Sequence, residues 1–294
     1  MIAILRILLL RNVPFWTQNL WRRRLRWCVA GLYLYVGVLL VLLFLENRLL
    51  FAGATFTPEW REPPPELNVR EVEIPIAGGS TVVGWFTAPS DWQPHQGAVL
   101  YAHGNGGNLS FRARIISLWR KQLNRAVLAY DYPGYGKSPG PVSEAGCYAA
   151  GDGAYDWLVQ EMKIPAHEIV LLGESLGGAV AIDQAVRRDH RLLITLATFT
   201  SFPDIAQFKV PWLPVRSIVR NQFNNIAKIS RVRGPVFISH GTADAVTPLV
   251  HGESLAAAAR EPKRFQPLKE MGHVHPDSEE FWNAIRAFLD ETRH

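Results

Sequence analysis

From residue 98 to residue 291, short apolar runs alternate with stretches of helical periodicity, and this alternation admits very few folds. The apolar runs are AVLYAH (98–103), AVLAYDY (126–132), EIVLLG (168–173), LLITLAT (192–198), VFISH (236–240) and RFQPLK (264–269). The helical stretches lie around 110–123, 143–162, 176–188, 250–260 and 277–291. This order predicts an α/β fold with a mostly parallel twisted sheet and helices on both faces. Upstream, VREVEIPI and TVVGWFTA flank Gly78 and Gly79, which predicts a hairpin.

Functional residues of parallel sheets follow the carboxyl ends of the strands, and one such end carries a Gly-x-Ser-x-Gly pattern. Residues 173–177, GESLG, come directly after an apolar run and directly before the helical stretch LGGAVAIDQAV. Gly173 and Gly177 allow a sharp strand-to-helix turn, which raises the Ser175 hydroxyl above the sheet and aims the helix N-terminus at it. Ser175 is therefore predicted to be a nucleophile rather than an ordinary turn residue.

A serine hydroxyl attacks only when a base takes its proton, and that base must be oriented by a third group. In this kind of sheet the acid and then the histidine follow the serine along the chain. Asp244 lies in the loop of VFISHGTADAVTP, and His273 lies in FQPLKEMGHVHP. We predict Ser175, Asp244 and His273 as the catalytic residues. His275 remains an alternative base, and Asp204 an alternative acid.

The negative charge of a tetrahedral intermediate requires backbone donors that are already in place. The early strand AVLYAH runs into the glycine-rich loop GNGGN, which has the expected position for one donor. We predict an oxyanion hole formed by the backbone N–H groups of Asn105 and Leu176. His103 and His240 each precede a glycine at a strand end, and we interpret both as residues that brace loops.

The N-terminal part contains one long uncharged apolar run, CVAGLYLYVGVLLVLLFL, at residues 28–45. Eighteen helical residues nearly span the hydrocarbon core of a bilayer. A buried core helix is disfavoured because the run is apolar on every face. A cleaved signal peptide is disfavoured because the region ahead of the run is long and Glu46, Asn47 and Arg48 follow it. We predict an uncleaved transmembrane anchor.

Charge predicts the orientation of this anchor and the division of the rest of the chain. The arginine-rich WRRRLRW lies within residues 1–27, which we assign to the cytoplasmic side as a basic, interfacial segment. Everything after residue 48 then lies on the outer side, periplasmic or lumenal. Residues 46–68 include the proline-rich TPEWREPPPELN and are predicted to be a linker. Residues 69–294 form the predicted catalytic domain.

Composition argues against several other classes of protein. The net charge is +5, but six arginines precede residue 28 with no acidic residue among them, so the remainder is near neutral. A nucleic-acid partner therefore has little support. The two cysteines, Cys28 and Cys147, form neither a disulfide framework nor a zinc-binding spacing.

Five motifs taken together resemble a known family. HGNGGN, DYPGYGKSPG, GESLGGAVA, HGTADAVTP and MGHVH occur in this order, as in the alpha/beta-hydrolase superfamily. With the N-terminal anchor and the ENRLLF segment, the chain resembles the membrane-anchored abhydrolase-domain branch over about residues 45–292. The resemblance implies an alpha/beta-hydrolase fold and a hydrolase that works without metal or organic cofactor, with Ser175 as nucleophile, Asp244 as acid and His273 as base. Relatives often carry His-Asn-Asp where this chain has His273-Val274-His275, so both histidines stay candidates.

The insertion at about 203–233 has the position of a short lid over this site. It mixes apolar residues (Phe202, Phe208, Trp212, Leu213, Ile218, Phe223) with basic ones (Lys209, Arg216, Arg220, Lys228, Arg231, Arg233). One interpretation is ordinary helix packing with a solvated basic face. The other is an apolar acyl pocket whose basic rim faces anionic lipid headgroups.

The resemblance leaves several substrate classes open, because the branch resembles esterases, thioesterases, lipid hydrolases and some peptidases. We expect a membrane-tethered serine hydrolase that cleaves acyl esters or thioesters of lipids or lipidated substrates. A serine peptidase or amidase is the alternative within the enzymes. A catalytically silent hydrolase-fold protein that binds a partner at the membrane is the alternative of another class.

Overall fold

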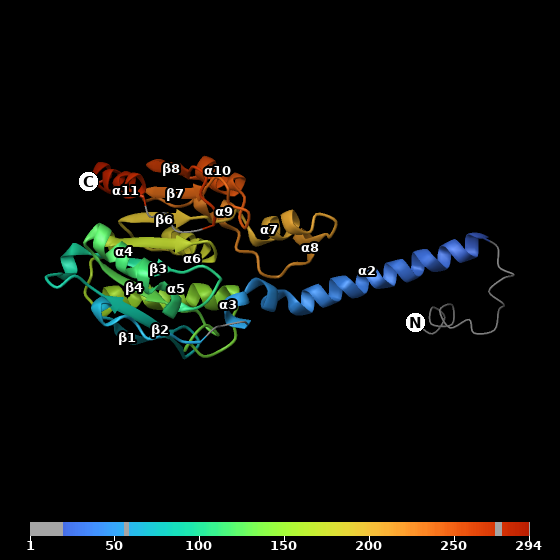
Figure 1. Ribbon diagram of the computed structural model, residues 1–294, viewed down its shortest axis with the longest axis horizontal. Coiled ribbons are helices and arrows are strands. Elements are labelled where there is room, and N and C mark those ends of the chain that lie inside the picture. The colour runs from blue at the N-terminus through green and yellow to red at the C-terminus, as the bar shows by residue number, and fades with distance from the viewer. Residues whose placement is uncertain (1–19, 56–58, 274–277, 294) are drawn as a thin grey trace. The chain divides into compact units, whose positions relative to one another are not determined.

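Two compact units make up the chain in the computed structural model, which describes residues 20–55, 59–273 and 278–293 (Figure 1). The first, Met1–Glu46, is here called the helical unit. The second, Asn47–His294, is called the sheet unit because it holds all eight strands. Each unit is described by itself below.

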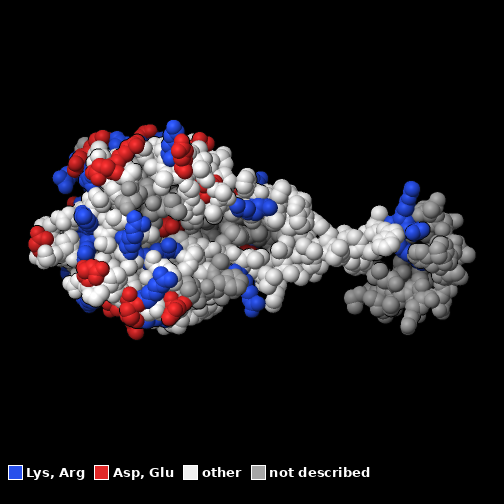
Figure 2. All heavy atoms as spheres, in the orientation of Figure 1, with Lys and Arg blue, Asp and Glu red and all other residues white. Residues whose placement is uncertain are grey.

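Within the described residues, the helical unit is the part of helix α2 (Leu20–Leu50) that ends at Glu46. The part Arg23–Leu50 is long and apolar enough to cross a membrane by length and composition, and none of its most apolar window is buried. Figure 2 shows the middle of this helix free of charged side chains, with basic side chains gathered at its N-terminal end. Only Asn47–Leu50, the last turn of α2, belongs to the sheet unit.

The sheet unit is built on one eight-stranded sheet in the order β1-β2-β4-β3-β5-β6-β7-β8. The strands are β1 Arg70–Ile76, β2 Ser80–Thr87, β3 Ala98–Ala102, β4 Ala126–Tyr130, β5 Ile169–Glu174, β6 Leu192–Leu196, β7 Val236–Gly241 and β8 Lys263–Leu268. Strands β3 to β8 run parallel, whereas β1 and β2 form an antiparallel hairpin that joins the sheet at β4. The prediction of a mostly parallel sheet is confirmed. The sequence indicated it because strands that are apolar on both faces need helices to cover both faces of the sheet.

Helices cover both faces of the sheet. They are α4 Ala113–Leu123, α5 Glu144–Gln160, α6 Leu176–Arg187, α10 Leu249–Ala258 and α11 Glu279–Glu291. Helices α4 and α11 pack on one face through residues such as Trp119 and Trp282, whose rings lie 4.7 Å apart. Helices α5, α6 and α10 cover the other face. On the face drawn in Figure 2, charges of both signs are interspersed over the sheet unit.

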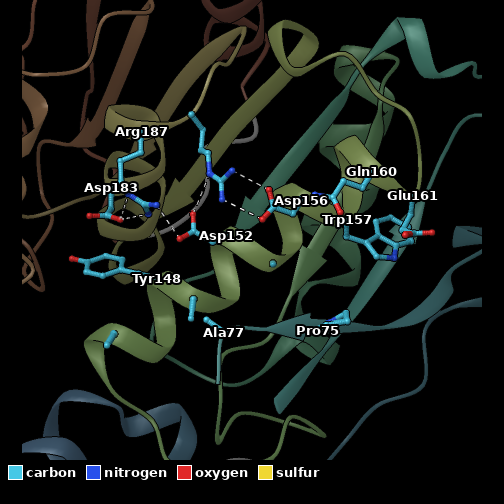
Figure 3. Close-up of a pocket in the computed structure, with 14 residues that line it drawn as sticks. Pro75, Ala77, Tyr148, Asp152, Asp156, Trp157, Gln160, Glu161, Asp183 and Arg187 are labelled. Carbon is cyan, nitrogen blue, oxygen red and sulfur yellow. Dashed lines mark hydrogen bonds and ion pairs between the residues drawn. The ribbon is translucent and has the colours of Figure 1, made fainter. Parts of the chain in front are cut away.

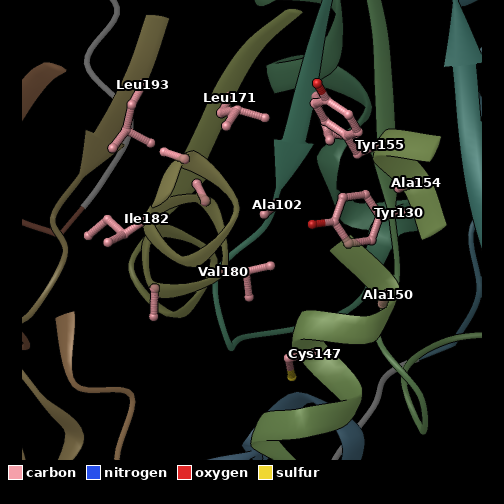
Figure 4. Packing of buried hydrophobic residues seen from close by; sticks show 14 of the residues in the cluster. Ala102, Tyr130, Cys147, Ala150, Ala154, Tyr155, Leu171, Val180, Ile182 and Leu193 are labelled. Atoms are coloured by element: carbon pink, nitrogen blue, oxygen red, sulfur yellow. The ribbon is translucent and has the colours of Figure 1, made fainter. Parts of the chain in front are cut away.

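Helices α5 and α6 pack against the sheet through buried apolar residues (Figure 4). Ala150 and Ala154 of α5 are buried, and so are Val180 and Ile182 of α6. Each buried methylene contributes about 0.8 kcal/mol to stability. This contact also fixes the start of α6, where the predicted nucleophile lies.

The remaining elements lie in connections. The insertion predicted as a lid contains three short helices, α7 Phe202–Lys209, α8 Val215–Ile218 and α9 Asn225–Ile229. Helix α3, Ala52–Thr55, follows α2. Parts of the segment predicted as a linker pack on the sheet unit: Phe51 and Leu67 are buried, and the Trp60 ring lies 5.6 Å from that of Trp85.

Candidate active site

Ser175 connects β5 to α6 in a backbone conformation that few side chains adopt, with φ 53° and ψ −112°. Its N–H donates to the Leu196 carbonyl of β6 at 2.8 Å, which holds the turn in place. At Gly177 an added Cβ would lie 1.9 Å from the Ala102 carbonyl oxygen of β3. Only glycine therefore lets α6 start this close to the sheet. Strained backbone of this kind is typical of functional sites.

Asp244 and His273 meet at the next strand ends. Asp244 follows β7 and His273 follows β8, and His273 Nδ1 lies 2.7 Å from Asp244 Oδ2. The other carboxylate oxygen, Oδ1, accepts the N–H groups of Val246 and Thr247, each at 2.8 Å. The Asp244 side chain is fully buried, whereas 21% of the His273 side chain is exposed. A carboxylate on Nδ1 leaves Nε2 as the ring atom that can take a proton.

The environment of Asp244 keeps it ionised. Burial alone would raise the pKa of this carboxyl group, but the hydrogen bond with His273 and those from the backbone of Thr247 and Val246 outweigh it. The pKa of Asp244 therefore lies below its ordinary value. An ionised carboxylate in this position can hold the imidazole in one orientation and stabilise its protonated form.

Ser175 and His273 line one cavity of about 450 Å³, and Asn105 and Leu176 line it with them. Among the described residues, no hydrogen bond occupies the backbone N–H of Asn105 or that of Leu176. The structure thus brings all five predicted site residues to the carboxyl ends of β3, β5, β7 and β8: four line the cavity, and Asp244 lies behind His273. Free donors beside a hydroxyl and an imidazole suit a reaction in which an oxyanion forms.

The loop that carries Asn105 is braced from below by His103. His103 Nδ1 lies 2.7 Å from the Gly104 carbonyl oxygen, and Nε2 lies 3.0 Å from Asp131 Oδ1. Asp131 also accepts the Leu109 N–H at 2.8 Å. His103, Asp131 and Leu109 are all fully buried. We therefore interpret this hydrogen-bond network as one that fixes the loop and takes no part in the chemistry at the cavity.

His240 has a similar part in the loop that carries the acid. Its Nε2 donates to the Thr247 carbonyl at 2.7 Å. Burial lowers the pKa of this histidine, so it stays neutral at neutral pH. Thr247 in turn donates its N–H to Asp244, and His240 therefore supports the acid from behind.

The sequence left two alternatives open, Asp204 as the acid and His275 as the base. Asp204, at the start of α7, accepts a hydrogen bond from Thr200 Oγ1 at 2.8 Å and pairs with Arg216 at 2.8 Å. These contacts cap and brace the lid insertion. His275 lies outside the described residues.

Several residues of the cavity carry no sequence signal that would single them out. Leu49 and Leu50 line it, although they are the last residues of an apolar helix. Arg112 lines it as well and donates to the Gly106 carbonyl. Glu174 also lines the cavity and accepts a hydrogen bond from Tyr101 Oη at 2.7 Å. Its position inside the Gly-x-Ser-x-Gly pattern is the sequence signal that could have indicated a place near the site.

A larger concavity of about 750 Å³ lies over α5 and α6, away from these residues (Figure 3). Three of its acidic side chains are paired: Arg187 contacts Asp152 at 2.9 Å, Arg188 contacts Asp156 at 3.0 Å, and Lys228 contacts Asp183 at 2.7 Å. None of the described residues that line it is a serine, cysteine or histidine. Nor does any group of three or more metal-binding side chains form within the described ranges. The smaller cavity is therefore the candidate active site.

Comparisons of the sequence with known proteins agree with this fold. The family model described as "Alpha/beta hydrolase family" matches residues 99–268, from β3 to the end of β8. The uncharacterized protein Rv2307c of Mycobacterium tuberculosis is 36% identical over 231 residues, which is 76% of this chain and 80% of that protein. The uncharacterized protein YfhR of Escherichia coli is 32% identical over 232 residues, with the same shares covered.

Solved structures resemble the chain at low sequence identity. The esterase Pf2001 of Pyrococcus furiosus superposes with a TM-score of 0.63 at 17% identity, over 81% of this chain and 97% of that one. Est1E of Butyrivibrio proteoclasticus, solved with ferulic acid bound, gives a TM-score of 0.62 at 17% identity, over 75% and 98%. At such identities the likeness shows a shared fold.

The lowered pKa of Asp244 predicts how stability depends on pH. The unfolded chain has an aspartate pKa of about 3.9. The ionised group therefore adds stability that is fully present above this value and is lost as the pH falls through the lower folded pKa. We expect Asp244→Asn to flatten the fall in the free energy of unfolding below about pH 4. Urea unfolding in detergent at several pH values measures this.

The matched control is Asp91→Asn, because Asp91 is an exposed aspartate in a turn. Its pH profile should follow that of the wild type. If Asp244→Asn loses stability with falling pH as steeply as the wild type does, the hydrogen bonds described for Asp244 do not favour its ionised form.

Proposed function

The chain belongs to the alpha/beta hydrolase family, and from this premise we propose that it is a serine hydrolase that cleaves acyl esters or thioesters. One observation carries the proposal. An ionised, buried carboxylate orients His273 at 2.7 Å beside a cavity into which the strained turn at Ser175 also opens. A hydroxyl, an oriented imidazole and free backbone donors are the parts that acyl transfer needs.

In the proposed mechanism His273 Nε2 takes the proton of the Ser175 hydroxyl while Oγ attacks the substrate carbonyl carbon. The carbonyl oxygen becomes an oxyanion, which the N–H groups of Asn105 and Leu176 stabilise; one such donor is worth about 10²- to 10³-fold in kcat. The intermediate then collapses, and His273 returns the proton to the leaving alcohol or thiol. Water, deprotonated by the same imidazole, releases the acid from the acyl-enzyme and restores Ser175.

The lining of the cavity supports an acyl group as the part of the substrate that is bound. Its apolar residues are Leu49, Leu50, Leu176, Phe199, Phe202, Ile205 and Val246. The Pyrococcus furiosus protein of the same fold is an esterase. We infer lipid or lipidated substrates. Of the basic residues in the insertion, Arg216 is paired with Asp204 and braces the insertion itself.

A fluorophosphonate probe tests the nucleophile, because an activated serine Oγ displaces fluoride from its phosphorus. We expect the wild type to be labelled in detergent and Ser175→Ala not to be. Turnover of p-nitrophenyl butyrate should fall on the order of 10⁴-fold or more in Ser175→Ala, since only binding and the oxyanion donors remain. His273→Gln should lose activity to a similar extent, whereas His275→Gln should stay within a few-fold of the wild type.

Thermal unfolding provides the control that each variant is folded. Labelling of folded Ser175→Ala at the wild-type rate would mean that another residue is the nucleophile. Loss of activity in His275→Gln with activity kept in His273→Gln would assign the base to His275.

We further propose that α2 anchors the protein by crossing the membrane once, with the N-terminus in the cytoplasm. Its length, its apolar composition and the arginines at its start support this topology. In sealed vesicles that expose the cytoplasmic face, added protease should leave the sheet unit intact until detergent opens the vesicles. Digestion without detergent would place the sheet unit in the cytoplasm instead.

A further inference from the structure

The last turn of α2 and the residues after it, Asn47–Ala54, are here called the post-helix segment. Although α2 is the apolar helix of the chain, this segment belongs to the sheet unit. Leu49 and Leu50 line the same cavity as Ser175. Leu50 is 6% exposed and Leu49 is 59% exposed, so Leu50 lies within the wall and Leu49 at its rim.

The post-helix segment is fixed to the site by specific contacts. The Gly53 N–H donates to the Asn105 carbonyl at 3.0 Å. An added Cβ at Gly53 would lie 2.2 Å from that carbonyl oxygen, so glycine is required for the approach. Phe51 is fully buried with its ring 6.2 Å from that of Phe223, and Asn221 donates to Asn47 at 2.9 Å. The segment is thus held between the loop that carries Asn105 and the lid insertion.

Exposed apolar side chains mark the mouth of this cavity. Of the described residues that line it, Leu49 and Val246 are apolar and yet 59% and 51% exposed. They come from opposite parts of the sequence, and a neighbour of each, Leu50 and Thr247, lines the cavity as well. Water therefore meets apolar surface at the mouth, which favours a ligand whose own apolar part continues outward.

We propose that the post-helix segment determines acyl-chain selectivity, with Leu49 and Leu50 forming the wall along which a long acyl chain leaves the site at Ser175. This inference rests on the proposed serine-hydrolase function. A short acyl group fills the inner part of the cavity and does not need Leu49, because Leu49 lies at the rim. A long chain passes Leu49, and each methylene that the wall removes from water strengthens binding about fourfold. The substrate class is therefore a long-chain acyl ester or thioester, whose acyl chain a membrane lipid and a lipidated protein share.

Two fluorophosphonates, one with a two-carbon and one with a twelve-carbon alkyl chain, test the inference on the full chain in detergent. The measured quantity is the ratio of the labelling rates, long over short. We expect the wild type to prefer the long probe, and Leu49→Ser to lower the ratio about fifteenfold through lost contact with roughly two methylenes. Leu49→Met, which keeps an apolar side chain of similar size, should retain the ratio.

Val250→Ser is the matched control, because Val250 is 56% exposed but does not line the cavity. Its ratio should equal that of the wild type. An unchanged ratio in Leu49→Ser, or a wild type without preference for the long probe, would overturn the inference while leaving the hydrolase in place. A wild type that neither probe labels would instead contradict the proposed function itself. Because each ratio is internal to one preparation, a partly unfolded variant does not change the result.

Discussion

The contact of α6 with the sheet is the constraint on which the rest of the site depends. At Gly177 and Gly178 an added Cβ would lie 1.9 Å from Ala102 and 1.8 Å from Thr198, so the helix begins as near the strands as backbone can come. That approach forces Ser175 into its positive φ and makes its N–H donate to β6. The apolar packing of α5 and α6 against the sheet holds the turn against this strain.

Around this fixed point, loops from separate strands supply the other groups. Each has its own brace: His103 and Asp131 under the loop of Asn105, and His240 behind Asp244. The buried charge of Asp244 is compensated by three hydrogen bonds, so it can remain ionised without solvent. In the account proposed here, rigid strand ends hold the reacting groups and the post-helix segment adds the acyl wall.

Much of this arrangement could be predicted from local patterns. The parallel sheet, the turn at Ser175 and the loop positions of Asp244 and His273 follow from apolar runs, glycine spacing and chain order. The choice between Asp244 and Asp204 could not be made from residue type, because it depends on which carboxylate the fold brings to His273. The sequence could not predict that Leu49 and Leu50 line the cavity. They end an apolar helix that contains many other leucines, and only their tertiary contacts distinguish them.

In the proposed reaction, the acyl group of the substrate is bound covalently to Ser175 before water releases it. Mixing the wild type with a p-nitrophenyl acyl ester, quenching with acid within milliseconds and mapping the peptides by mass tests it most directly. We expect a mass increment of one acyl group on the peptide that contains Ser175, and we expect hydroxylamine to remove it. Hydrolysis of the ester with the acyl group on another residue, or with no acyl-enzyme under any substrate that turns over, would contradict it.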